Sequence, residues 1–297
     1  MHSKLFRLLA ALVLTAAMAG ATAAPASAVT GGTPDTENRY SNVGMIVFYD
    51  DGGRYRCTAT LIAPTLLLTA GHCTFGTDGK TLVTFEPVVD EQPPLSIPVA
   101  ENPDDGYTEQ ELRRAGYTFG TAYTHPEYSN FTDMDSWNDV GVVVLDSAVK
   151  GVAPATVAEL GTLDAIPTAQ LSSTIFRAVG YGTEVRKAES GPQNPQPMSY
   201  PVIRRYADMP GQKLTPQILQ TNGNENDNRG TGGTCFGDSG GPLLHPAEDG
   251  VIVGVTSYGY TSNCRYIDGY QRVDIPVVQD WLATFTADTQ PGGKSRR

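Results

Sequence analysis

The strongest constraint on the fold is an alternation of short apolar runs with turn-forming residues along almost the whole chain. The sequence of 297 residues contains 32 glycines and 21 prolines, which interrupt the apolar runs too often for long helices. Short runs rich in β-branched and aromatic residues between such turn signals are typical of β-strands. We therefore predict an all-β protein. The predicted strands are Val43–Tyr49, Thr58–Leu68 with a turn at Pro64, Val140–Leu145, Phe176–Gly182 and Val251–Tyr258.

The other segments read as loops or short helices. Val277–Phe285 has helical spacing and is predicted to end the ordered chain as an α-helix. Residues 86–116 are acidic and contain prolines, so we expect a surface insertion with a short helix near Thr108–Arg114. Residues 186–198 and Asn222–Gly233 are rich in turn formers and are predicted to be loops.

The first 28 residues have the pattern of a signal peptide. Lys4 and Arg7 precede a short apolar run, Leu8–Ala19, and Ala26-Ser27-Ala28 supplies a cleavage site. The alternative is a membrane anchor, but a spanning helix needs about 20 apolar residues and this run is shorter. We therefore expect a secreted, extracellular protein whose mature chain begins at Val29 and has no membrane-spanning segment.

Net charge argues against nucleic acid as a partner. The chain carries −11 at pH 7, and removal of residues 1–28 takes away two positive charges, so the mature chain carries −13. Nucleic-acid binding needs a basic surface. The basic end, residues 286–297, is expected to be a disordered tail.

The exported chain contains four cysteines, Cys57, Cys73, Cys235 and Cys264. An even number in an exported protein suggests disulfides, and four cysteines allow three pairings. Sequence locality favours Cys57–Cys73 and Cys235–Cys264. A zinc site is the alternative, but the chain has neither a C-x-x-C motif nor paired histidines. We expect no metal site and no cofactor.

Three motifs carry the chemistry. They are Leu68-Thr69-Ala70-Gly71-His72-Cys73, Asn138-Asp139-Val140 and Gly237-Asp238-Ser239-Gly240-Gly241-Pro242. Together they resemble the chymotrypsin-like serine peptidases, and the resemblance extends over nearly all of residues 29–285. Further matches are Val29-Thr30-Gly31-Gly32, the His125-Pro126 pair followed by Tyr128, Val179-Gly180-Tyr181-Gly182 and Ser257-Tyr258-Gly259.

The resemblance implies a fold and a set of roles. The fold is two packed six-stranded antiparallel β-barrels with a C-terminal α-helix and the site between the barrels. Both favoured disulfides match widespread family disulfides. His72, Asp139 and Ser239 would form the catalytic triad, because a serine hydroxyl is a weak nucleophile and needs a base in contact with it. The N–H groups of Gly237 and Ser239 would form the oxyanion hole.

The same resemblance implies an activation pair. The α-amino group of Val29 would insert into the protein and pair with Asp238, which would otherwise be a buried charge without a partner. We expect no propeptide beyond the signal peptide. The alternative is that residues 29–32 are only a glycine turn.

Other interpretations of these residues are weaker. Asp133, Asp135 and Asp146 compete with Asp139, but only Asp139 directly opens a buried strand. A Gly-x-Ser-x-Gly elbow also occurs in α/β-hydrolases, whose triad order is Ser, acid, His, whereas the order here is His, Asp, Ser. The alternative from another class is a catalytically inactive binding protein on a protease fold. It is disfavoured because all three triad residues are present.

Specificity is the least determined feature. The position that holds the trypsins' pocket aspartate is Gly233, followed by Thr234. Asp268 could instead face the pocket, which would favour substrates with Arg or Lys before the cleaved bond. Alternatively, Asp268 could point outward and pair with Arg265 or Arg272. The substrate preference would then be broad or chymotrypsin-like. Ser257, Tyr258 and Gly259 are expected to pair with the substrate.

The spacing of the motifs departs from the family in one place. His72 and Asp139 are 67 residues apart, and the excess over the family spacing maps to residues 86–116, which could border the substrate cleft. The expected partners are protein or peptide substrates and proteinaceous inhibitors, with the chain a monomer.

Overall fold

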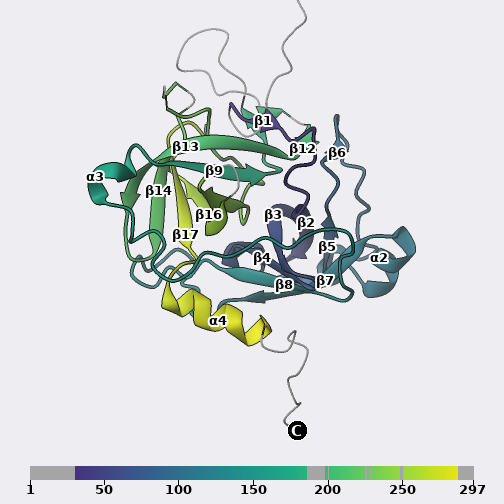
Figure 1. The fold of residues 1–297 in the computed structure, drawn as a ribbon. Helices are drawn as coiled ribbons and strands as arrows, with labels where there is room; N and C mark the ends of the chain where they lie inside the picture. The colour runs from purple at the N-terminus through teal and green to yellow at the C-terminus, as the bar shows by residue number, and fades with distance from the viewer. Residues whose placement is uncertain are drawn as a thin grey trace, which may run out of the picture.

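Two closed antiparallel β-barrels form the core of the computed structural model, which describes residues 31–185, 198–199, 201–224, 226–227, 229–247 and 250–286 (Figure 1). The signal peptide, Val29, the tail beyond residue 286 and most of the predicted 186–198 loop lie outside the described residues. Each barrel has six strands, so the prediction of two six-stranded barrels is confirmed.

The first barrel is formed by the segment that contains His72 and Asp139. Residues 51–52 join its first two strands in a two-residue turn in which both backbone φ angles are positive, the geometry that favours an Asp-Gly pair. Its strands, in spatial order, are β2 (Val43–Asp50), β3 (Gly53–Ala63), β4 (Leu66–Thr69), β8 (Gly141–Leu145), β7 (Thr118–Thr124) and β5 (Asp78–Thr84), which closes onto β2.

The second barrel is closed by pairing between its first and last strands, β9 and β13. β1 (Thr33–Pro34) adds to the edge of β13. The strands, in spatial order, are β13 (Arg205–Leu214), β14 (Ile218–Asn222), β17 (Ile267–Arg272), β16 (Val251–Gly259), β15 (Pro242–His245) and β9 (Ile175–Gly180). Two short pairs lie outside the barrels, β10 (Glu184–Val185) with β11 (Met198–Ser199) and β6 (Val88–Asp90) with β12 (Val202–Ile203).

The C-terminal helix α4 (Pro276–Thr286) lies across both barrels, below them in Figure 1. Its buried residues Val278 and Leu282 belong to an apolar cluster that also contains Val142 of β8 and Val255 of β16. Burying this shared cluster fixes the two barrels against each other, and with them the residues that each barrel contributes to the site.

The insertion at 86–116 is more than a surface loop. It contains the 3₁₀ turn η2 (Pro103–Asp105) and α2 (Glu109–Ala115), whose first turn is capped by Thr108 and Glu111 as a capping box. Ile97, Ala100, Tyr107 and Leu112 are buried against Met45, Val47 and Leu82 of the first barrel. The sequence predicted the helix but missed this packing. Figure 1 shows α2 at the outer edge of the first barrel.

Two other short helices are η1 (Gly71–Cys73) and α3 (Thr168–Leu171). In the described part of the chain, no helix has both the length and the apolar character needed to span a bilayer.

Candidate active site

His72 and Asp139 lie at neighbouring ends of two paired strands. β4 leads into η1, which carries His72, and Asp139 lies two residues before β8. Thr69 of β4 is the register partner of Gly141 of β8, so the two chain segments leave the barrel side by side. The barrel itself therefore brings these two residues together across 67 positions of sequence.

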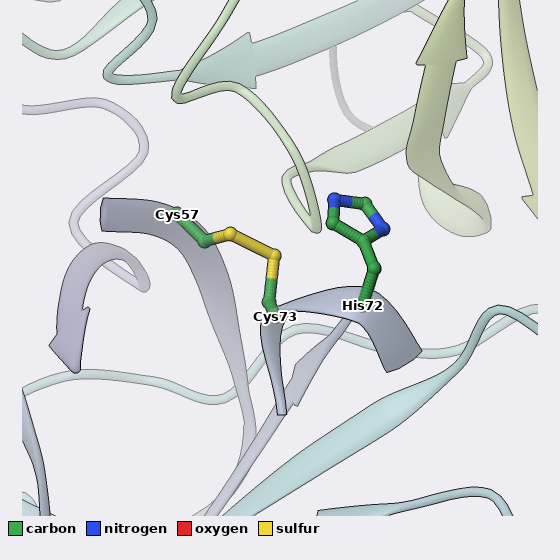
Figure 2. A group of neighbouring side chains, drawn as sticks. All are labelled: Cys57, His72 and Cys73. Carbon is green, nitrogen blue, oxygen red and sulfur yellow. A yellow bond between two sulfur atoms is a disulfide. The ribbon is translucent and has the colours of Figure 1, made fainter. Parts of the chain in front are cut away.

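The carboxylate of Asp139 is fully buried and holds the imidazole of His72. His72 Nδ1 lies 2.9 Å from Asp139 Oδ2 and 3.1 Å from Oδ1, and the His72 backbone N–H donates to Oδ1 at 2.8 Å. Ser257 Oγ donates to Oδ2 at 2.6 Å. A carboxylate only accepts, so the Nδ1 proton lies toward Asp139 and Nε2 is left as the basic nitrogen. In Figure 2 the imidazole of His72 lies beside the Cys57–Cys73 disulfide.

Ser239 comes from the second barrel and is placed beside the His72 segment. Its carbonyl accepts from Thr58 N at 2.8 Å. The next residue, Gly240, has φ +77°, and a Cβ there would lie 2.0 Å from Thr69 Oγ1 and 2.7 Å from Ala70 N. Only glycine allows this approach. Among the described residues no hydrogen bond joins Ser239 Oγ to His72, and in ligand-free enzymes such bonds are often long.

Backbone hydrogen bonds fix two peptide groups next to Ser239. The carbonyl of Phe236 accepts from Thr183 N and that of Asp238 accepts from Gly241 N, both at 2.8 Å. A trans peptide points its N–H opposite to its carbonyl. The N–H groups of Gly237 and Ser239 are therefore turned away from these bonds. Gly237 adopts φ +101°, which a side chain would disfavour.

Asp238 points into the protein. It is 1% exposed, and its carboxylate accepts from Gly182 N at 2.7 Å and Cys235 N at 2.9 Å. Burial raises the pKa of Asp238 to about 6, although those two hydrogen bonds and the charges of Arg56 and Arg205 act to lower it. Its predicted partner Val29 lies outside the described residues.

Both expected disulfides are present, Cys57–Cys73 and Cys235–Cys264. The first joins β3 to the turn that carries His72 (Figure 2). Cys57, His72 and Cys73 lie close enough to resemble a metal site. Because the two sulfur atoms are bonded to each other, no thiolate is available to a metal there. The second disulfide lies beside the cavity next to Ser239.

A cavity of about 400 Å³ opens beside Ser239. A larger cavity, of about 920 Å³, contains none of the predicted site residues. The walls of the smaller cavity come from the segment that ends at Ser239, from β16 and from the loop after β16. They are Thr234, Cys235, Phe236, Ser239, Thr256, Ser257, Tyr258, Gly259, Thr261, Ser262 and Cys264.

Asp268 lies directly behind this cavity wall. It is 1% exposed, and Thr234 N donates to its Oδ2 at 2.7 Å. A Cβ on Gly233 would lie 2.8 Å from the same oxygen. Asp268 is therefore buried and does not point outward, and Arg272 pairs with Asp164 and Asp274 instead. Burial raises the pKa of Asp268 to about 7, and the charge of Asp238 adds to this rise.

Sequence reasoning missed several residues that contact the site. Ser257 was expected only to pair with substrate, yet its hydroxyl binds Asp139. Trp137 Nε1 donates to Ser257 Oγ at 2.9 Å, and Gln271 Oε1 accepts from Asp139 N at 3.0 Å. The sequence carries little signal for these residues. Trp137 lies two residues before Asp139 and Gln271 three residues after Asp268, but their contacts cross between the barrels.

Two curated proteins are similar in sequence to most of this chain. Brachyurin from Leptuca pugilator is 28% identical over 268 residues, covering 88% of this chain and all of that protein. Chymotrypsin-C from Mus musculus is 25% identical over 86% of this chain and 87% of its own length.

Solved structures agree on the fold alone, because their sequence identities are low. A structure described as HL collagenase has a TM-score of 0.58 at 16% identity, covering 87% of this chain and 99% of that one. Human heparin binding protein has a TM-score of 0.56 at 18% identity, covering 90% and 100%. The family model named Trypsin matches residues 29–282. The chain therefore belongs to the trypsin family of serine endopeptidases.

Proposed function

We propose that this protein is a secreted endopeptidase that hydrolyses peptide bonds through an acyl-enzyme, with His72, Asp139 and Ser239 as its triad. One observation carries the proposal. The buried carboxylate of Asp139 holds His72 at 2.9 Å, while Ser239 follows a backbone segment whose peptide planes are fixed by hydrogen bonds. Base, nucleophile and oxyanion donors are thus supplied by two barrels that pack on a shared core.

The proposed reaction begins with proton transfer from Ser239 Oγ to His72 Nε2 as Oγ attacks the scissile carbonyl carbon. The carbonyl oxygen becomes an oxyanion that the N–H groups of Gly237 and Ser239 stabilise, each by about 3 kcal/mol. Asp139 stabilises the imidazolium. The C–N bond then breaks as His72 returns the proton to the leaving amine, and an ester on Ser239 remains.

Water completes the cycle by the same chemistry. His72 takes a proton from the water as its oxygen attacks the ester carbonyl, and the proton then passes to Ser239 Oγ when the C–O bond breaks. The products are a carboxylic acid and an amine. Ser239 is restored, so no metal or cofactor takes part in the proposed cycle.

The cavity beside Ser239 supports a mixed preference for the side chain before the cleaved bond. We propose that Thr234 and the Ser257–Gly259 segment form its walls, and that Asp268, which packs against Gly233, adds negative charge from behind. Thr234 N already donates to the Asp268 carboxylate. A substrate cation would therefore interact with Asp268 less directly than with a carboxylate exposed in the cavity. Arg and Lys would therefore be accepted alongside apolar residues.

We also propose that the α-amino group of mature Val29 pairs with Asp238. The support is the inward orientation of the Asp238 carboxylate and its bonds to Gly182 and Cys235, which tie it to the segment that carries Gly237 and Ser239. An ammonium group there would offset the burial of the carboxylate and hold that segment in place.

The proposed partners are protein or peptide substrates and proteinaceous inhibitors that occupy the same cleft, with the enzyme acting as an extracellular monomer. The rival function is a binding protein on a protease fold. It is not favoured, because all three proposed triad residues are present and hydrogen bonds hold the peptide groups of the proposed oxyanion donors.

A covalent serine-directed phosphonate distinguishes the two. The secreted protein should be labelled, and peptide mapping should place the label on Ser239. A His72→Ala variant serves as the matched control, because without the base the labelling rate should fall at least about 10³-fold. A correctly processed, folded protein that remains unlabelled would favour the binding protein.

A further inference from the structure

Two glutamine side chains of the second barrel bind the segment that carries Asp139. Gln271 lies in β17 and is fully buried, and Gln217, just before β14, is 9% exposed. Gln271 Oε1 accepts from the backbone N–H of Asp139 at 3.0 Å. Gln217 Nε2 donates to the carbonyl of Asp135 at 3.2 Å. The glutamine pair, Gln217 and Gln271, therefore holds both ends of residues 135–139, which lead into β8 of the first barrel.

The hydrogen bonds around Gln271 fix the orientation of its side-chain amide. Gln271 Nε2 donates to Gln217 Oε1 at 3.1 Å, to the Gln217 carbonyl at 3.2 Å and to the Arg272 carbonyl at 3.1 Å. These three oxygens only accept, so they must face the NH2 group of the amide. The reversed orientation would place Oε1 against the three oxygens and the NH2 group against the Asp139 N–H. Gln271 Oε1 is thus fixed as an acceptor for Asp139.

The backbone next to Asp139 has a conformation that its surroundings must hold. Asn138 has φ +44°, a left-handed conformation that asparagine tolerates better than most residues but that still costs free energy. Asn138 Nδ2 donates to the carbonyl of Glu127 at 3.1 Å. Such a conformation persists where neighbouring contacts maintain it. The hydrogen bond between Gln271 and Asp139 is one of these contacts, so its loss would let the segment relax.

The position of Asp139 affects where the imidazole of His72 lies. The Asp139 carboxylate accepts from the His72 backbone N–H and faces its Nδ1. The proposed nucleophile, Ser239, comes from the second barrel, as does the glutamine pair. The pair therefore relates the position of Asp139, and through it that of His72, to Ser239. A displacement of about 1 Å in such an arrangement can lower a reaction rate about 100-fold.

We propose that the glutamine pair positions the catalytic triad by holding Asp139 in place relative to the second barrel. This inference rests on the proposed function, since it takes the three predicted residues as the triad. Neither Gln217 nor Gln271 lines the cavity beside Ser239. Loss of either amide should therefore slow the chemical step and leave substrate binding almost unchanged.

Methionine substitutions test the proposal, because methionine is close to glutamine in length but cannot form these hydrogen bonds. Gln271→Met should lower kcat by about 10- to 100-fold, while KM for one peptide substrate should change less than about twofold. Gln217→Met should lower kcat several-fold. Its effect is smaller because Gln271 still accepts from Asp139 and only the bonds of the Gln217 side chain are lost.

Gln279→Met is the matched control. Gln279 lies in α4, and its Nε2 donates to the carbonyls of Ala158 at 3.1 Å and Val273 at 2.7 Å. Neither bond involves residues 135–139. The control variant loses the same chemical group, so it should unfold at a lower urea concentration than the wild type but keep the wild-type kcat and KM.

Peptide hydrolysis and urea unfolding of the wild type and the three variants decide the outcome. A wild-type kcat in folded Gln271→Met, or an equal loss of kcat in Gln279→Met, would overturn the inference while phosphonate labelling of Ser239 still upheld the proposed function. If Gln271→Met did not fold, a wild-type kcat in Gln217→Met would overturn it instead. Wild-type protein that the phosphonate did not label would overturn both.

Discussion

At the scale of single residues, Asp268 links burial to specificity. Its carboxyl group has a pKa of about 7, so it is neutral below that pH and negatively charged above it. Only the charged form attracts a substrate cation. The ratio of kcat/KM for cleavage after Arg to cleavage after Leu should therefore rise as pH increases through about 7. Taking the ratio removes the pH dependence of the catalytic steps, because both substrates share those steps.

Asp268→Gly should lower that ratio at pH 8 by about tenfold or more and make it independent of pH. Peptide substrates that differ only in the residue before the cleaved bond provide the measurement. An unchanged ratio at pH 8 would show that Asp268 has no influence on the cavity.

The residue scale also shows where sequence reasoning was sufficient. His72, Asp139 and Ser239 could be predicted because each lies in a local motif, and the structure places His72 and Asp139 in contact. The orientation of Asp268 could not be predicted, because it depends on Thr234 from another segment. The larger cavity contains none of the predicted site residues, so the predicted site rests on the motifs and not on cavity size.

At the scale of elements, the Cys235–Cys264 disulfide closes a segment that contains Ser239 and β16. Replacing both cysteines by Ala should lower the free energy of unfolding by about 2–5 kcal/mol. It should also reduce kcat/KM, because Cys235 N donates to Asp238, which precedes the proposed nucleophile Ser239. Urea unfolding and peptide hydrolysis measure the two effects. A double variant with wild-type stability and activity would contradict this role of the bond.

The strands that the sequence predicted are those with continuous apolar runs. The strands equivalent to β2, β8 and β16 were all predicted from such runs. β13 was missed because Arg205–Leu214 contains charges, a proline and a glycine. The structure explains why these residues still form a strand. Asp208 lies opposite Arg177 of β9, and their side chains pair at 2.7 Å.

At the scale of the whole molecule, a buried arginine joins the two barrels. Arg204, just before β13, is fully buried and pairs with Asp35 at 2.8 Å. It also donates to the carbonyls of Val43 and Phe85 in the first barrel and to the Tyr181 hydroxyl in the second. These bonds fix the distance between the barrels that carry His72 and Ser239.

Arg204→Met should destabilise the protein by about 3–5 kcal/mol, because it leaves the Asp35 carboxylate buried without its partner. The double variant Arg204→Met/Asp35→Leu should recover much of that loss. Urea unfolding of the wild type, the single variant and the double variant forms the test. A single variant as stable as the wild type would contradict the account of this pair.

The start of the mature chain provides a second test at this scale. Protein beginning at Val29 should be active, whereas protein that retains Ala26-Ser27-Ala28 should be nearly inactive, because its α-amino group would not reach Asp238. Both forms should unfold cooperatively, which separates activation from folding. Equal peptidase activity in the two forms would rule out the Val29–Asp238 pair.

The most direct test of the central claim compares the wild-type enzyme with Ser239→Ala on one peptide substrate. The proposed mechanism requires Ser239 Oγ to form the acyl-enzyme, so kcat should fall by about 10⁴- to 10⁶-fold. Ser239 is only partly buried, and removing its single hydroxyl oxygen should leave the urea unfolding curve unchanged. A folded Ser239→Ala protein that retained more than a few per cent of wild-type activity would contradict the assignment of Ser239 as the nucleophile.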